Sequence, residues 1–198
     1  MPCNLFRTIF LIAACAVSTG AMAHIGTDFQ AHSEIGFLGG LLHPFTGMDH
    51  LAAMLAVGFW SALTARRLWT TPLAFAAMLL AGALLGLGGI ELPDVEPMIA
   101  ASLLVLGLLV VLRTRLPAAL AAALAGLFAI FHGVAHGTEL AGAAQIWPPL
   151  LGMLITTVAL HAIGLSLGLA SRHTSAWVPR VAGAGVAAFG VTLLAQLA

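Results

Sequence analysis

The chain has 198 residues, of which 61% are hydrophobic and only 7% are charged, and its formal net charge at pH 7 is zero. Soluble domains carry about 25% charged residues, so the composition excludes a soluble globular protein and indicates an integral membrane protein. The zero net charge also argues against nucleic-acid binding, which leaves a basic patch. Eight histidines outnumber the seven basic residues, all of them arginine, and imidazole is the commonest metal ligand in proteins.

Residues 1–23 have the pattern of a secretory signal peptide. Arg7 precedes an apolar run, and residues 21–23 (Ala-Met-Ala) fit a small-residue cleavage site. Cleavage would remove both cysteines of the chain and leave His24 at the N-terminus of the mature protein, residues 24–198. Two alternatives are an uncleaved anchor and a bacterial lipoprotein signal that ends at the second cysteine.

Six long apolar segments follow a short polar segment, residues 24–34, which is expected to be periplasmic. A helix needs roughly 20 apolar residues to cross a bilayer, so the pattern predicts an all-α, polytopic membrane protein with one six-span transmembrane domain. The predicted spans cover residues 35–63, 72–90, 97–112, 117–136, 148–170 and 181–198. The candidate positions for close helix packing are Gly82, Gly86, Gly89, Gly183 and Gly185.

The arginines predict how the spans are oriented, because basic residues accumulate in cytoplasmic loops. Every arginine after the signal falls in the loops that follow the first, third and fifth spans, and the other two loops carry acidic residues and no basic one. We therefore expect a multi-pass protein of the bacterial inner membrane, with both the N-terminus and the C-terminus in the periplasm.

The first predicted span contains a polar interruption at residues 43–50 (HPFTGMDH). Ionisable side chains are costly in hydrocarbon, so His43, Asp49 and His50 each need a partner, water or an ion. Pro44 removes a backbone donor and clashes with the preceding turn, which predicts that the helix is interrupted near Pro44 and Gly47. Such a break would let the two imidazoles and the carboxylate converge as metal ligands. The alternative is a structural hydrogen-bonded pair of Asp49 and His50.

A second polar motif, residues 131–139 (FHGVAHGTE), closes the fourth span. His132, His136 and Glu139 are spaced i, i+4, i+7, so they share one helical face, and two imidazoles four residues apart can chelate one ion. The motif is not the HExxH of zinc proteases, which has a glutamate base between the histidines. We interpret these residues as metal ligands, with a polar network between helices as the alternative.

Other polar residues are further candidates for a metal pathway. His161 lies in the middle of the fifth span, where an ordinary buried histidine is the alternative. Glu96 and Ser102 lie in the outer half of the third span. His24 would combine its imidazole with a free amine to capture metal, unless the N-terminal segment is only a flexible tail.

These motifs resemble the HupE/UreJ family of bacterial nickel/cobalt permeases. The resemblance covers nearly the whole mature chain. It is carried by residues 24–26 (HIG), 36–37 (GF), the 43–50 motif, residues 56–58 (AVG) with Trp60, residues 96–103, and the 131–139 motif. The resemblance implies secondary transport of Ni²⁺ or Co²⁺ for nickel enzymes such as hydrogenase or urease, with the maturation proteins of those enzymes as indirect partners. By resemblance the metal-pathway residues are His43, Asp49, His50, His132, His136 and Glu139, and less directly His161.

We therefore expect a non-enzymatic permease that binds one divalent metal between the first, fourth and fifth spans and holds no permanent cofactor. Its partners are the metal and the lipid bilayer, and the sequence is compatible with a homo-oligomer. A chain without lysine has no phosphate-binding P-loop, so transport would use passive flow, proton exchange or the membrane potential. Two positive charges gain about 4.6 kcal/mol per 100 mV on moving inward, at about 2.3 per charge.

The sequence leaves alternatives open for both the metal and the activity. Imidazole and carboxylate ligands suit nickel, cobalt, zinc and copper alike. A membrane metalloenzyme of the His-box type is a second interpretation, although such sites need several histidine clusters to hold two irons. A third is an accessory protein that binds metal without conducting it.

Overall fold

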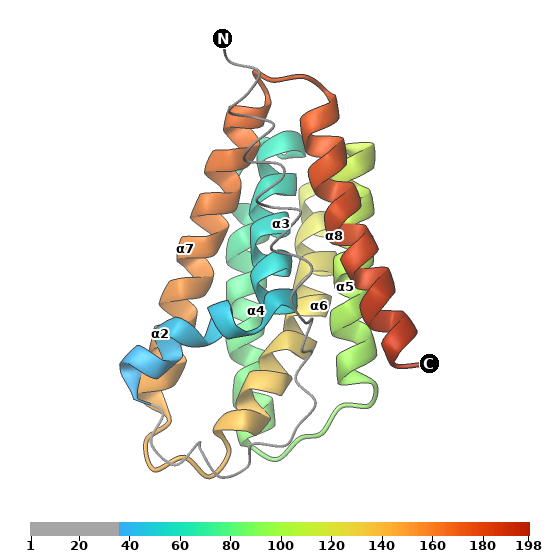
Figure 1. The fold of residues 1–198 in the computed structure, drawn as a ribbon. Helices are drawn as coiled ribbons and strands as arrows, with labels where there is room; N and C mark the ends of the chain where they lie inside the picture. The colour runs from blue at the N-terminus through green and yellow to red at the C-terminus, as the bar shows by residue number, and fades with distance from the viewer. Residues whose placement is uncertain (1–35) are drawn as a thin grey trace.

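The computed structural model describes residues 36–198, and over this range the chain is entirely α-helical apart from its connections (Figure 1). Five helices, α4 to α8, are long and apolar enough to cross a membrane. The all-α, polytopic membrane architecture expected from the sequence is therefore confirmed. The expected signal peptide, the 24–34 segment and His24 lie outside the described residues. The helices are α2 (Phe37–Thr46), α3 (Met48–Thr64), α4 (Thr70–Leu87), α5 (Val95–Leu112), α6 (Ala118–Leu140), α7 (Trp147–Ser171) and α8 (Trp177–Gln196).

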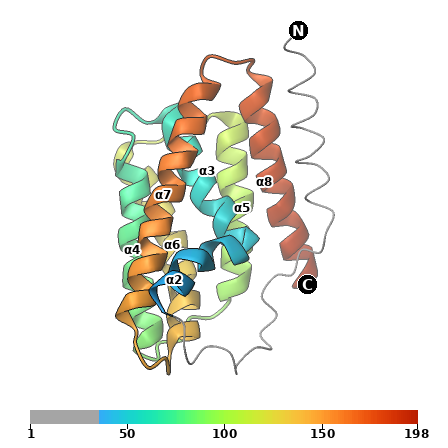
Figure 2. The same cartoon turned by 60° about the vertical axis from the view of Figure 1, so that its left-hand side comes forward.

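Helices α3 to α8 run lengthwise through one bundle, and α2 lies across its side (Figures 1 and 2). Helix α3 has 17 residues, so it is about 26 Å long, close to the thickness of a hydrocarbon core. Helix α6 continues to Leu140, four residues beyond the predicted span. The extension places Glu139 on the helix rather than in the loop that follows.

The predicted break in the first span is present, and of the two residues expected to supply it, Gly47 is the one at which the helix stops. Gly47 has an extended backbone (φ −95°, ψ 103°), whereas Pro44 stays inside the last turn of α2. The proline removes one backbone hydrogen bond of α2, but the chain remains helical through it. The turn at Gly47 sends α2 away from the bundle axis. The first span is therefore two helices of different direction.

Helix α2 is held against α7 by close backbone contact. A Cβ atom on Gly40 would meet the backbone of Pro149, and one on Gly152 would meet the backbone of α2. The Thr156 hydroxyl also donates a hydrogen bond of 2.8 Å to the Leu41 carbonyl oxygen. With 10 residues, α2 is too short to cross a bilayer, so α7 fixes where its side chains lie.

Glycines allow the other helix pairs to approach closely, as small residues do in membrane bundles. Helix α4 packs on α6, where a Cβ on Gly82 would meet the Ile130 carbonyl and one on Gly86 would meet the α6 backbone. Gly183 packs in the same way against α5. The expectation for Gly89 and Gly185 is wrong, because neither has a neighbour within 4 Å. Gly89 instead has a φ of +78° in the turn after α4, a conformation that favours glycine.

The two ends of the bundle carry opposite charge. The α3–α4, α5–α6 and α7–α8 connections meet at one end, uppermost in Figure 1, and contain five of the six arginines of the described chain, while the sixth, Arg180, lies in the first turn of α8. We call it the arginine end. The acidic residues Glu91, Asp94, Glu96 and Glu139 lie toward the other end, the acidic end, where the C-terminus also lies.

Buried apolar side chains fill the bundle between the two ends. On α3 they run from Ala53 through Met54 and Val57 to Trp60, each at most 1% exposed. Leu79 of α4 and Leu106 of α5 pack into the same core. No polar side chain of this stretch of α3 interrupts the apolar row, so the two ends are separated by an apolar layer.

The α4–α6 contact generates a stability prediction. Substitution Gly82→Ala places a methyl group against the Ile130 carbonyl, and the backbone of α6 cannot move aside cheaply. We expect a loss of about 1–3 kcal/mol in the free energy of unfolding, the usual range for overpacking. Titration of the purified protein with sodium dodecyl sulfate in mixed micelles measures this loss. The matched control is Gly185→Ala, which has open space, and an equal loss in both variants would contradict the packing argument.

Candidate metal centre

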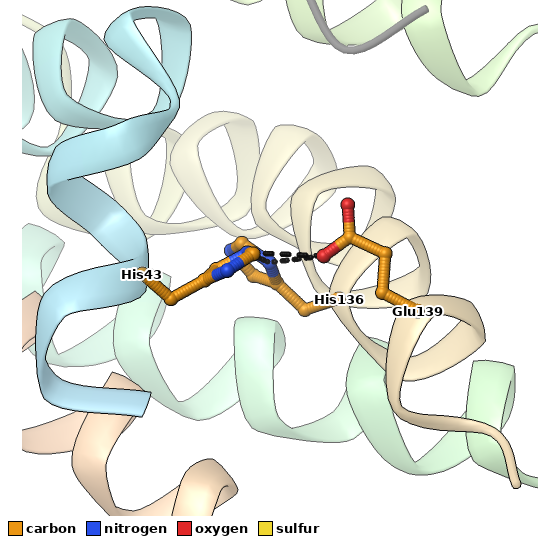
Figure 3. Close-up of side chains that lie close together, drawn as sticks. All are labelled: His43, His136 and Glu139. Carbon is orange, nitrogen blue, oxygen red and sulfur yellow. Dashed lines mark hydrogen bonds and ion pairs between the residues drawn. The ribbon is translucent and has the colours of Figure 1, made fainter. Parts of the chain in front are cut away.

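Three side chains from two helices converge near the acidic end (Figure 3). His43 of α2 lies with its Nε2 atom 3.1 Å from His136 Nδ1 and 3.0 Å from Glu139 Oε2, both on α6. His136 Nδ1 lies 3.7 Å from the same carboxylate oxygen. Two imidazole nitrogens and one carboxylate oxygen therefore form a triangle, which we call the donor triad.

The size of the donor triad suits a single metal ion. Donors that bind an ion at about 2.1 Å lie about 3.0 Å apart at right angles and about 3.4 Å apart in a tetrahedron. The three measured separations, 3.0, 3.1 and 3.7 Å, span these values. Imidazole and carboxylate are ligands that first-row divalent metals accept. With three protein ligands, such an ion keeps open positions for water or for the next ligand.

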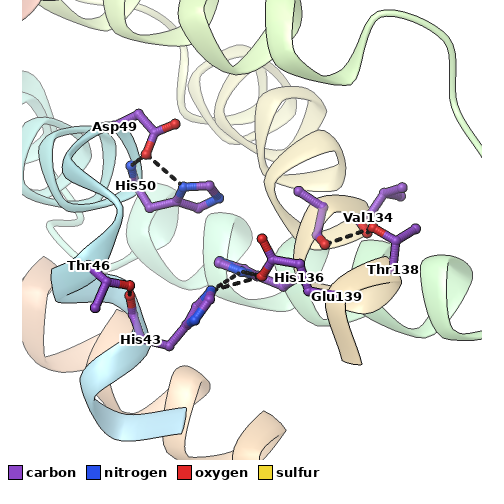
Figure 4. Close-up of polar contacts among 9 residues, drawn as sticks. His43, Thr46, Asp49, His50, Val134, His136, Thr138 and Glu139 are labelled. Atoms are coloured by element: carbon purple, nitrogen blue, oxygen red, sulfur yellow. Dashed lines mark hydrogen bonds and ion pairs between the residues drawn. The ribbon is translucent and has the colours of Figure 1, made fainter. Parts of the chain in front are cut away.

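Local structure explains why these three residues meet. The turn at Gly47 and the packing of α2 on α7 bring His43 against α6. Thr46 Oγ1 donates to the His43 carbonyl oxygen at 2.7 Å and closes the last turn of α2. On α6, Thr138 Oγ1 donates to the Ala135 carbonyl oxygen at 2.8 Å (Figure 4). The hydroxyl bonds to the helix itself, and the α6 extension places Glu139 at position i+3 from His136.

Asp49 and His50 form a pair of their own (Figure 4). Asp49 Oδ1 accepts hydrogen bonds from the His50 backbone N–H at 2.8 Å and from His50 Nδ1 at 3.0 Å. The expected convergence of His43, Asp49 and His50 on one point is not observed, because the turn at Gly47 directs His43 to the donor triad without the other two. The hydrogen-bonded pair that was the alternative is what forms.

The imidazole of His50 nevertheless continues the row of histidines inward. Its ring centroid lies 4.3 Å from that of His136 and 4.6 Å from that of His132. His132 Nε2 lies 3.0 Å from Ser102 Oγ of α5, which brings the expected Ser102 to the histidines. Within the described chain, His50 Nε2, His132 Nδ1 and His136 Nε2 are buried and have no hydrogen-bond partner.

Burial increases along this row. The Glu139 side chain is 29% exposed, His43 is 12% exposed and His136 is 2% exposed. His132 is completely buried, and lies about 10 Å deeper along α6 than Glu139. The polar residues therefore lead from an accessible carboxylate at the acidic end to buried imidazole rings inside the bundle.

His161 of α7 stands apart from the row. The ring of Phe75 on α4 lies between, with centroids 5.2 Å from His161 and 5.6 Å from His132. Both ring nitrogens of His161 are buried without a partner among the described residues. Helix α7 therefore supplies none of the donor triad, although a metal site between the first, fourth and fifth spans was expected. Helix α7 contributes to the site by holding α2 in position.

Two further residues lie outside the row, one that the sequence suggested and one that it did not. Glu96 is exposed at the start of α5 and is not part of the donor triad. Phe75 was not singled out from the sequence, because a phenylalanine in an apolar helix gives no signal that distinguishes a lipid-facing ring from one between two histidines. The position of Phe75 became visible only from the packing of α4 on α6 and α7.

Comparison with known proteins gives two matches. The family model described as HupE / UreJ protein matches residues 12–193. The curated relative Protein HupE from Rhizobium leguminosarum bv. viciae is 42% identical over 185 residues, which cover 92% of this chain and 94% of the relative. No solved structure matches the chain.

The geometry of the donor triad generates a binding prediction. Glu139→Gln keeps the shape of the side chain but removes the charge that a divalent cation requires, so we expect Co²⁺ to bind at least about tenfold more weakly. Visible absorption of Co²⁺ added to the purified protein reports both affinity and ligand geometry. The matched control is Glu96→Gln, an exposed carboxylate at the same end. Equal affinity in wild type and Glu139→Gln would remove the carboxylate from the site.

Proposed function

The chain belongs to the HupE/UreJ family, and from this membership we propose that it is a secondary transporter of a divalent transition metal, Ni²⁺ or Co²⁺. The metal is the transported substrate, and the donor triad is the place where it binds first. The observation that carries the proposal is the row of histidines behind the triad, which leads from partly exposed donors to buried imidazoles with unpartnered nitrogens. A purely structural polar network would pair those nitrogens.

The order of burial supports a path for the ion. Glu139 and His43 receive the ion at the accessible end, where the carboxylate offsets part of its charge. His136 belongs to the donor triad through Nδ1, and its ring also packs on His50. The ion moves inward by exchanging one donor at a time, so it is never without ligands in a medium that solvates charge poorly.

The apolar layer requires a conformational step before the ion can leave. Met54, Val57 and Leu106 are buried directly beyond the histidines, and they offer no imidazole or carboxylate ligand. Passage toward the arginine end therefore needs the helices around this layer to move apart while the acidic end closes. Such exchange between two accessible states is how secondary transporters work in general.

The proposed orientation follows from the charge of the two ends. The arginine end faces the cytoplasm of a bacterial inner-membrane protein, and the acidic end with the C-terminus faces the periplasm. Metal therefore enters from the periplasm. The protein is not an enzyme in this proposal. A His-box metalloenzyme would bind iron and form an oxygen-dependent product, and an accessory protein would bind metal without flux.

Uptake by proteoliposomes tests the function. We expect wild-type protein to accumulate Ni²⁺ or Co²⁺, and His136→Ala and His50→Ala to lower the initial rate at least about tenfold, because each removes a ligand from the path. Elemental analysis of washed vesicles measures the flux of each metal separately. His173→Ala is the control, since His173 is exposed at the arginine end. Unchanged uptake in both ligand variants would refute the pathway, and binding without uptake in wild type would favour the accessory role.

The Asp49–His50 pair generates a prediction that separates transport from binding. By accepting from Nδ1, the carboxylate keeps the Nε2 lone pair of His50 available as a ligand, as carboxylates commonly do when they accept a hydrogen bond from a metal-binding histidine. Asp49→Asn is expected to lower uptake about 10- to 100-fold while Co²⁺ still binds at the donor triad. Spectroscopic binding and vesicle uptake, measured on the same preparation, check the split. A parallel loss of both would place Asp49 in the first binding site instead.

A further inference from the structure

A second polar feature lies at the arginine end, remote from the donor triad. A cavity of about 840 Å³ opens there among the three connections and the helix ends next to them. Its size is in the range of small-molecule sites, roughly 300–1,000 Å³. Five of the six arginines at this end line it, namely Arg66, Arg67, Arg113, Arg115 and Arg172.

No carboxylate balances these arginines. The cavity lining contains no acidic residue, and the acids of the described chain lie toward the other end or, like Asp49, are paired with histidine. None of the five arginines makes an ion pair within residues 36–198. Five like charges around one cavity repel one another, and an anion between them relieves that repulsion. The accumulation of basic residues in cytoplasmic loops explains why the arginines lie at this end. It does not explain why five of them surround a cavity.

Two helix starts add further donors. Helix α4 begins at Thr70 and helix α6 at Ala118, and both residues line the cavity. Neither helix start has a side-chain cap. In α4 the Thr70 N–H donates to the Arg67 carbonyl oxygen and Pro72 has no N–H, so the available backbone donors come mainly from the first turn of α6. The N-terminal ends of helices also carry partial positive charge, which favours anions. Guanidinium groups and helix starts therefore both present N–H donors and positive charge to an anion in the cavity.

Three carbonyl oxygens near the cavity already accept hydrogen bonds from the protein. Ser61 Oγ donates to the Leu68 carbonyl oxygen at 2.7 Å, and Trp60 Nε1 donates to the Thr114 carbonyl oxygen at 3.0 Å. Arg172 donates to the Ala62 carbonyl oxygen. The lining of the cavity is therefore rich in hydrogen-bond donors, which a ligand with several charged oxygens requires.

We propose that this cavity binds a phosphate-bearing anion. Arginine suits this group because its planar fork of N–H donors matches two phosphate oxygens at once. The phosphate belongs either to the headgroup of an anionic phospholipid of the cytoplasmic leaflet or to a soluble phosphate ester. A bound phosphate also lowers the positive potential that a departing cation meets at this end. That last consequence rests on the proposed function, whereas the binding itself does not.

Two probes with the same phosphate chemistry distinguish the sources. Phosphatidylglycerol binding is measured by native mass spectrometry of the detergent-purified full-length protein, with phosphatidylcholine as the zwitterionic control. Glycerol 3-phosphate binding is measured by calorimetry. Preference for phosphatidylglycerol without glycerol 3-phosphate binding identifies a lipid headgroup, and binding of glycerol 3-phosphate identifies a soluble ester. Binding of neither probe overturns the proposal.

Arginine variants test the location. The double variant Arg66→Gln/Arg67→Gln is expected to weaken binding at least tenfold, and Arg115→Gln serves as a second variant in case the first does not fold. The matched control is Arg180→Gln, because Arg180 lies at the same end but stacks on Trp177 at 5.6 Å and does not line the cavity. Unchanged binding in the cavity variants, or an equal loss in Arg180→Gln, overturns the site.

A fold control uses the remote end of the molecule. Variants that fold correctly retain Co²⁺ binding at the donor triad, which contains no residue of the cavity. If wild-type vesicles take up no metal while the protein binds a phosphate probe, only the proposed transport is refuted. If the wild-type protein binds neither phosphate probe while its vesicles take up metal, only this inference is refuted.

Discussion

The contact of α2 with α6 is the interaction on which the site depends. An α-helix in hydrocarbon satisfies its own backbone but not the imidazoles and carboxylates that it carries, so those groups must find partners on other helices. Helix α6 supplies His136 and Glu139 on one face, and only the sideways course of α2 brings His43 to them. That course in turn depends on the turn at Gly47 and on backbone contact with α7.

Charge is distributed so that the two ends of the bundle attract opposite ions. The acidic end offers a carboxylate and imidazoles to a cation, and the arginine end offers guanidinium groups to an anion. Between them lies an apolar layer without imidazole, carboxylate or guanidinium groups. The bundle is held together by close glycine contacts, notably of α4 with α6 and of α3 with α7, rather than by a hydrophobic driving force between helices.

Much of the fold and part of the site could be predicted from particular residues. Helix α6 carries His136 and Glu139 three positions apart, so their meeting follows from helical spacing alone. The Asp49–His50 pair is equally local. Ser102 was placed on the path by its depth in the third span, and it contacts His132. Phe75 and the isolation of His161 could not be predicted, because they depend on how α4 rotates between α6 and α7.

The membrane class, the approximate spans, the shared end of the arginine loops and the residue types of the donor triad could all be read from the sequence. These features follow from apolar length, charge placement and helical periodicity, which are properties of one segment at a time. The packed helices were needed to show that the chain stays helical through Pro44 and turns at Gly47, that His43 and His50 contact His136 from two separate helices, and that five arginines line one cavity. Those outcomes depend on rotations and crossings of packed helices, which no single segment encodes.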